Sequence, residues 1–85
     1  MDDIEQTVID YLRSRALQKS ISEALDGSSR LMEMGVLDSL ELMSLVTHME
    51  ESYGVTLPDQ EFIPENFETP RTIADLIRRV RTSAP

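Results

Sequence analysis

The 85-residue sequence contains no cysteine, which excludes disulfide bonds, thiolate metal sites and a cysteine nucleophile. This agrees with a reducing cytoplasm, where we expect the protein to work. No apolar run approaches the roughly 20 residues that span a membrane. The N-terminus, Met1-Asp2-Asp3-Ile4-Glu5, is acidic, whereas a secretory signal begins with basic residues. The sequence therefore predicts neither a membrane span nor a secretory signal.

Basic residues are scarce, and the middle of the chain has none. There are 8 Lys and Arg against 16 Asp and Glu, and the formal net charge is −8. Between Leu31 and Pro70 no Lys or Arg occurs. Such a segment repels nucleic acid and anionic lipid and attracts basic protein surfaces. A docking face and a solvated face that only maintains solubility both remain possible. The acids are Glu33, Asp38, Glu41, Glu50, Glu51, Asp59, Glu61, Glu65 and Glu68.

The chain length predicts one small domain over residues 1–85, with its core from about residue 3 to 81. Neither the alternation typical of strands nor an internal repeat is present. The first helix is predicted from Asp2 to about Arg15, and Leu17 and Ile21 either continue it or fold the next segment onto the core. The fold class is therefore all-α. The apolar stripe of this helix is Ile4, Val8, Tyr11 and Leu12.

A long connection is predicted from about Ser22 to Leu37, with a turn at Asp26-Gly27-Ser28-Ser29. A structureless loop of this length is unusual in a compact domain. We therefore expect burial of apolar side chains to fix it. The candidates are Leu31, Met34, Val36 and Leu37.

The second helix is predicted to begin at Asp38 or Ser39 and to end near Tyr53, where Gly54 supplies the stop. Asp38 is a suitable N-cap, and Glu41 completes a capping-box pattern. At about 100° per residue the core stripe is Leu42, Leu45, Val46, Met49 and Tyr53. The other side carries Leu40, Met43, Ser44, Thr47, His48 and Glu51, an apolar contact with an acidic rim that is typical of a transient docking patch.

Prolines divide the next stretch into short pieces, with a turn of helix predicted from Pro64 to Phe67. Phe62, Ile63 and Phe67 are its expected core anchors. The last helix is predicted with Thr72 as its cap and Asp75 at the third position. Its apolar face is Ile73, Leu76, Ile77 and Val80. The predicted architecture is a small bundle of three main helices and one short helix, with a long loop between the first two main helices.

Ser39 lies where the long loop meets the second helix. A hydroxyl at a helix N-terminus faces unpaired backbone N–H groups and the positive end of the helix dipole, which favours a phosphate ester. The single histidine, His48, lies roughly 180° around the helix from Ser39 and cannot act as its base. Leu37 stands where a Gly-Asp-Ser-Leu hydrolase has glycine, and there is no Gly-x-Ser-x-Gly elbow. The pattern favours a modified serine over a catalytic one.

Two other functions fit this sequence less well. An unmodified acidic helical adaptor would use the same apolar patch without a prosthetic group. A metal site is not expected, because Asp59, Glu61, Glu65 and Glu68 lack the spacing of a calcium-binding loop.

The chain resembles the acyl carrier protein family, which includes peptidyl carrier domains. The resemblance lies in the segment Leu37-Asp38-Ser39-Leu40, the long loop before it, the Tyr53-Gly54-Val55 exit of the second helix and the Thr72-Ile73 start of the last helix. The resemblance implies that Ser39 accepts 4′-phosphopantetheine from coenzyme A through a separate Mg²⁺-dependent transferase, with Asp38 helping to position metal and transferase. The protein would then carry acyl or aminoacyl thioesters without being an enzyme. The implied partner-contacting residues are Leu40, Glu41, Met43, Ser44, Thr47 and Glu51.

One departure bears on the cargo. Fatty-acid carriers usually have one residue between the loop glycine and the Asp-Ser pair, whereas Val36 and Leu37 follow Gly35 here, and Ser44 stands where they commonly have glutamate. The sequence resembles freestanding carriers of an amino acid or small acyl unit in specialised metabolism of the polyketide or nonribosomal peptide type. A fatty-acid or D-alanine carrier is the alternative. The implied partners are a phosphopantetheinyl transferase, a loading ligase or acyltransferase and a downstream synthase, and we expect a monomer.

Overall fold

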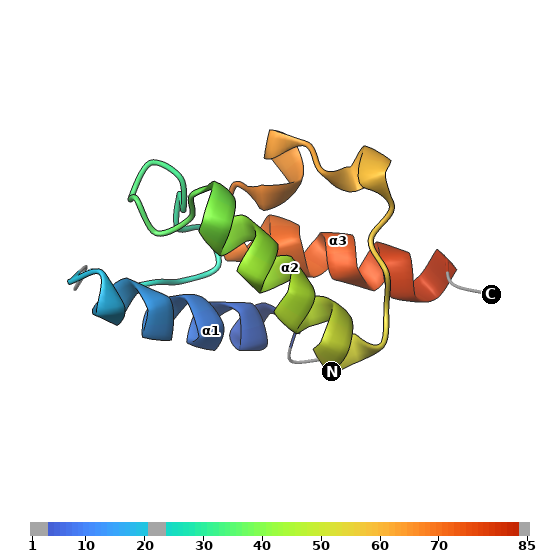
Figure 1. The fold of residues 1–85 in the computed structure, drawn as a ribbon, viewed down its shortest axis with the longest axis horizontal. Helices are drawn as coiled ribbons and strands as arrows, with labels where there is room; N and C mark the ends of the chain where they lie inside the picture. Colours follow the sequence, from blue (N-terminus) through green and yellow to red (C-terminus); the bar gives the residue numbers. More distant parts are fainter. Residues whose placement is uncertain (1–3, 21–23, 84–85) are drawn as a thin grey trace.

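The computed structural model describes residues 4–20 and 24–83. Within them the chain forms α1 (Ile4–Gln18), α2 (Ser39–Tyr53), η1 (Asp59–Glu61), η2 (Pro64–Phe67) and α3 (Pro70–Ser83), where η marks a 3-10 helix. α1 lies against both α2 and α3, and η2 packs against α3 (Figure 1). The predicted all-α bundle is confirmed, with η1 as an additional short helix.

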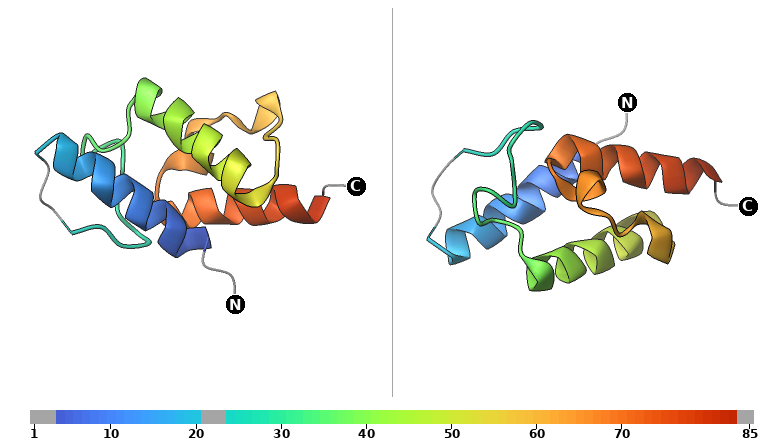
Figure 2. Two further views of the ribbon diagram at one scale, coloured as in Figure 1. Left: turned by 60° about the horizontal axis from the view of Figure 1, so that its bottom comes forward. Right: turned by 90° about the horizontal axis from the view of Figure 1, so that it is seen from above.

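The core is formed by one face of each long helix, the side chain of Phe67 and buried loop side chains. The loop residues are Leu25, Leu31, Val36, Leu37 and Leu57. The spacing that predicted the apolar faces is confirmed, although Tyr11, Leu42, Tyr53 and Val80 are only partly buried at its edges. α1 and α2 run antiparallel, so the end of α1 lies beside the start of α2 (Figure 2). Fully buried residues include Ile4, Val8, Leu12, Leu45, Met49, Ile73, Leu76 and Ile77.

The described part of the long loop is fixed by burial and by backbone hydrogen bonds. Leu31 is fully buried, and its N–H donates to the carbonyl of Glu68 over 3.0 Å. The carbonyl of Leu31 in turn accepts from the N–H groups of Val36 and Leu37, which are both buried. Met34 is partly buried against the core. The loop therefore leads to the start of α2 along a defined path.

α1 is longer than predicted. It ends at Gln18 instead of about Arg15, because the break comes at Ser20, which adopts a left-handed φ of 63°. Leu17 continues the helix but is 65% exposed, so it does not anchor the core. The predicted start at Asp2 and the contact of Ile21 lie outside the described residues.

α3 begins at Pro70, two residues before the predicted cap. The N–H of Thr72 donates to Oγ1 of Thr69, and the N–H of Thr69 donates to Oγ1 of Thr72, both over 3.1 Å. Thr69 is therefore the cap, and Pro70 occupies the first helical position, where a missing N–H costs nothing. The prediction of Thr72 as the cap was wrong, because Thr69 and Thr72 are both threonines and the sequence alone does not show which of them caps the helix.

The turn of helix predicted at Pro64–Phe67 is confirmed as η2. Of its expected anchors, Phe67 is 1% exposed and Phe62 is partly buried beside it, with their rings stacked at 6.0 Å between centroids. Ile63 is 43% exposed, so its prediction as a core anchor was wrong. The short 3-10 helices turn this side chain outward.

Candidate functional site

Ser39 is the first residue of α2, and it is exposed. Asp38, in extended conformation, caps the helix: its Oδ1 accepts from the N–H of Glu41 over 2.8 Å. At the other end Gly54 adopts a left-handed φ of 64°, which ends the helix. The predicted cap and stop are confirmed, and they place the Ser39 hydroxyl in solvent at the N-terminal end of a helix of 15 residues.

The second carboxylate oxygen of Asp38 faces α1. Lys19 Nζ lies 3.4 Å from Oδ2 of Asp38 and 3.5 Å from the carbonyl of Val36. The hydrogen bond from the backbone N–H of Glu41 is the main cause that lowers the pKa of the Asp38 carboxyl. Desolvation opposes it, and Lys19 lowers the pKa further. Asp38 is thus ionised next to Ser39 at neutral pH.

Glu41 does not lie where the sequence suggested. It is 8% exposed, and its two oxygens accept from Nε and Nη2 of Arg15 over 2.7 and 2.8 Å. The hydrogen bonds from Arg15 lower the pKa of Glu41, and the same contact raises the pKa of the guanidinium. The prediction that the Glu41 side chain completes a capping box was wrong, and its contact with Arg15 leaves little of this side chain exposed for the predicted contact with partner proteins. Burial between α1 and α2 makes this fork-to-fork pair the better arrangement.

The two cations are Arg15 in the last turn of α1 and Lys19 just after the helix, and they contact Glu41 and Asp38 near Ser39. No pattern in the sequence predicts this arrangement, because Arg15 and Glu41 are 26 residues apart. The start of α2 is therefore held to the end of α1 by charge as well as by the core.

The outer face of α2 is confirmed as exposed. Leu40 is 81% exposed and Met43 is 54% exposed, although large apolar side chains are more often buried. Thr47 and Glu51 are exposed and Ser44 is partly buried. That these residues contact partner proteins stays a prediction.

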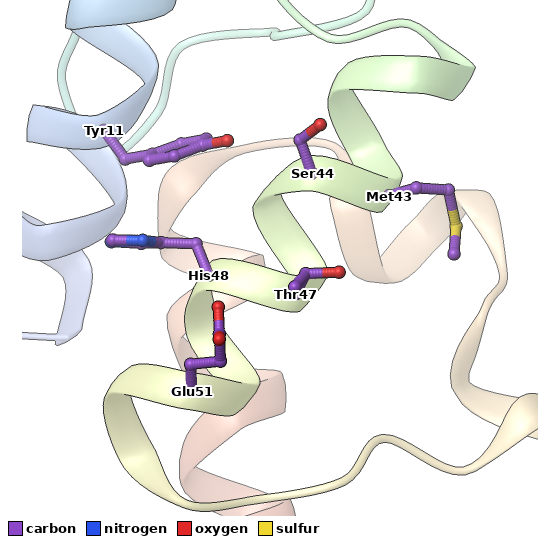
Figure 3. Close-up of a pocket in the computed structure, with 6 residues that line it drawn as sticks. All are labelled: Tyr11, Met43, Ser44, Thr47, His48 and Glu51. Atoms are coloured by element: carbon purple, nitrogen blue, oxygen red, sulfur yellow. The ribbon is translucent and has the colours of Figure 1, made fainter.

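A groove of about 450 Å³ lies between α1 and this face of α2 (Figure 3). Tyr11 and His48 form one wall, with ring centroids 4.6 Å apart and planes 22° from parallel. The sequence had placed Tyr11 in the core and His48 in solvent, but they are half-buried against each other, a pairing across two helices that spacing on one helix cannot reveal. The lining residues are Tyr11, Met43, Ser44, Thr47, His48 and Glu51.

The acidic middle segment is partly neutralised by the fold. Four of its nine acids form ion pairs with basic residues from outside the segment. The free acidic face is thus smaller than the sequence suggests, and Glu51 belongs to it. The pairs are Arg15–Glu41, Lys19–Asp38, Arg30–Glu68 and Arg79–Glu61.

The sequence model of the family described as "Phosphopantetheine attachment site" matches residues 7–79. The chain belongs to this family. It is thus a carrier protein for a covalently bound phosphopantetheine group, and carriers of this family are not themselves catalytic. They work with a phosphopantetheinyl transferase and with ligases or synthases.

Curated relatives of this carrier protein are similar along most of their length. The D-alanyl carrier protein of Lactobacillus delbrueckii subsp. bulgaricus is 24% identical over 93% of this chain and 95% of its own. The D-alanyl carrier protein of Streptococcus pyogenes serotype M5 is 35% identical over 78% and 80%. Aminoacyl carrier protein 2 of Bradyrhizobium diazoefficiens is 29% identical over 88% and 83%.

A solved structure titled "Crystal structure of FAD-dependent dehydrogenase" contains a chain that this carrier protein also matches. The TM-score is 0.71 and the identity 37%, over 84% of this chain and 99% of that chain. The matched chain therefore has about the size of this carrier.

The site fits the phosphopantetheine group. The Ser39 hydroxyl makes no hydrogen bond to any described residue, so it is free for esterification, and a phosphate there adjoins a helix N-terminus. Among residues 4–20 and 24–83, no helix is long and apolar enough to cross a membrane.

Proposed function

We propose that this chain carries an amino acid, with D-alanine as the first candidate, on 4′-phosphopantetheine attached to Ser39. When bound, the group supplies the thiol that forms the thioester. The observation that carries the proposal is an exposed serine at a capped helix N-terminus within the residues matched by the attachment-site family.

The residues around Ser39 have separate roles in this proposal. Asp38 fixes the first turn of α2 through its Oδ1 and keeps a negative charge beside the hydroxyl, where it can help to hold the metal ion of the transferase. Leu40 and Met43 offer the apolar contact of a docking face, with Ser44, Thr47 and Glu51 as its polar part. Glu41 is excluded from this face by Arg15.

The cargo is supported by the relatives. Those matched over most of their length are named D-alanyl or aminoacyl carrier proteins. This supports the D-alanine alternative better than a carrier of polyketide or nonribosomal peptide synthesis. Because coenzyme A and activated amino acids are intracellular, the proposal places the carrier in the cytoplasm.

A second candidate rests on the solved structure titled for an FAD-dependent dehydrogenase, which contains a chain 37% identical to this one. In that case the carried unit would be presented to a flavin enzyme for oxidation. The test is to add such a dehydrogenase to the loaded protein and follow the mass of the cargo, which would fall by two hydrogen atoms.

Intact mass spectrometry tests the attachment. The purified protein is incubated with coenzyme A, Mg²⁺ and a broad-specificity phosphopantetheinyl transferase, and we expect the mass to rise by one phosphopantetheine group. Ser39→Ala should abolish the increase completely, whereas Ser52→Ala, the same change at another exposed serine of α2, should retain it. An increase in Ser39→Ala would refute the assignment.

The loaded protein then tests the cargo. With ATP and a D-alanine:carrier ligase we expect one alanyl group per chain, released by hydroxylamine as thioesters are. Ligases for other amino acids and for short fatty acids serve as comparisons. Preferential loading of a fatty acid would contradict the aminoacyl proposal while leaving the carrier function intact.

A further inference from the structure

The groove beside α2 has one charged side chain that is not already engaged. Glu51 is exposed and makes no ion pair within the described residues, and no Lys or Arg lines the groove. The guanidinium carbon of Arg15 lies 5.9 Å from the Tyr11 ring centroid, but this guanidinium donates to Glu41. The charge of the groove is therefore negative.

The walls combine flat apolar surface with hydroxyl groups. Tyr11 and His48 provide stacked rings, and Ser44 and Thr47 provide hydroxyls along α2 (Figure 3). The Glu51 carboxylate points along the helix towards His48 (Figure 3). This combination fits a small group with a positive charge and an apolar part, and it does not favour an anionic acyl group.

The groove is within reach of Ser39. Met43, at its near end, lies one helical turn from Ser39 on the same side of α2. Glu51 lies at the far end of the groove. Because an α-helix rises about 1.5 Å per residue, Glu51 is about 18 Å from Ser39 along the helix axis. An extended phosphopantetheine arm is of comparable length, so its loaded end reaches Thr47 and Glu51 without leaving the surface of α2.

We infer that this groove is a resting site for the aminoacyl end of the arm, with the protonated α-amino group of the cargo next to the Glu51 carboxylate. The inference rests on the proposed function. A tethered group has a high local concentration, so one exposed ion pair suffices to bias where it lies. The contact is weak enough for partner enzymes to withdraw the cargo. The site would hold an aminoacyl cargo, which carries a positive charge, in preference to a neutral acyl cargo.

The experiment uses the full chain, loaded at Ser39 by a transferase from coenzyme A analogues in which an amide replaces the thioester. D-alanyl and propionyl forms differ only in the ammonium group. In ¹H–¹⁵N spectra at pH 7 we expect the D-alanyl form to shift the amide signals of Thr47 and Glu51 and the ring signals of His48 relative to the propionyl form.

Glu51→Gln should abolish these differences, whereas Glu65→Gln, the same change at an exposed residue of η2, should retain them. Three results would overturn this inference and leave the proposed function intact. They are equal shifts in the propionyl form, shifts that persist in Glu51→Gln, and no shifts in a chain whose mass shows that it is loaded. Failure of the transferase to modify Ser39 would overturn the proposed function and this inference with it.

Discussion

At the scale of single residues, the two acids beside Ser39 differ in environment although both are ionised. Asp38 is exposed, and one of its carboxylate oxygens accepts a hydrogen bond from the backbone of α2. Glu41 is only 8% exposed, and both of its carboxylate oxygens accept hydrogen bonds from Arg15. A buried carboxylate is tolerated because its charge is paired and its lone pairs are bonded. Arg15 therefore supports the start of α2, and with it the proposed attachment site, as the cap residue Asp38 does.

Replacing Arg15 tests this support. Arg15→Met keeps much of the side-chain length but leaves the Glu41 carboxylate partly buried without its partner, so we expect Tm to fall by several degrees. Arg13→Met is the matched control: Arg13 is exposed and only pairs with Asp10 at 3.5 Å, so its Tm should hardly change. Equal Tm values for the two variants in thermal unfolding would contradict the role of Arg15.

Acid should weaken the fold through the same pair. The pKa of Glu41 is lower in the folded state than its usual 4.5, so its stabilising effect is complete above that pH and is lost as the pH falls through the lowered value. We expect the free energy of unfolding, measured with urea, to fall below about pH 4.5. Glu41→Gln should have a flatter pH dependence in this range; an unchanged slope would assign acid sensitivity to other carboxyl groups.

At the scale of the elements, α2 has two faces with different tasks. Leu45 is fully buried while Leu40 is 81% exposed, although both are leucines on one helix. Truncating Leu45 to alanine should cost about 2–5 kcal/mol, and truncating Leu40 only about 0.5 kcal/mol or less. The inner face therefore determines stability and leaves the outer face free for binding.

Charge on the outer face should separate loading from folding. Leu40→Asp and Met43→Asp place a carboxylate in the proposed apolar contact, where desolvation against a partner is unfavourable. We expect the rate of phosphopantetheine transfer to fall about tenfold or more, which corresponds to roughly 1.4 kcal/mol, with an unchanged Tm. Circular dichroism beside the transfer assay checks both. Collapse of the fold would show that the face is assigned wrongly.

At the scale of the whole molecule, the net charge of −8 governs encounters with partners. The fold pairs four acids of the middle segment and leaves Glu51 on the outer face of α2 without an ion pair among the described residues. An exposed acidic surface attracts basic partners over a distance that salt shortens. Brief, salt-sensitive contacts suit a carrier that must be released after each transfer.

Salt should therefore raise KM more than it lowers kcat. Between 50 mM and 500 mM NaCl we expect KM of the transferase for this protein to rise several-fold, because exposed charges are screened. Glu51→Gln should reduce the salt dependence of KM. Glu68→Gln should change it less, because the Glu68 carboxylate already pairs with Arg30. A KM independent of salt would mean that the contact with the transferase is mainly apolar.

The sequence by itself determined the helical elements, and it is the source of the proposal that Ser39 is the attachment point. The spacing of apolar residues predicted three helices and their inner faces, and Asp38 and Gly54 predicted the ends of α2, because these signals act within one turn of helix. The motif around Ser39 pointed to the family that the comparison confirmed. Local chemistry sufficed for these features.

Only the tertiary structure decided which side chains meet across helices. Arg15 covers Glu41, and Tyr11 stacks on His48 to form the groove wall, because α1 and α2 run antiparallel in contact. The sequence could state the charge and the face of each residue on its own helix. It could not state the partner, since the register between two helices is set by packing of the whole core.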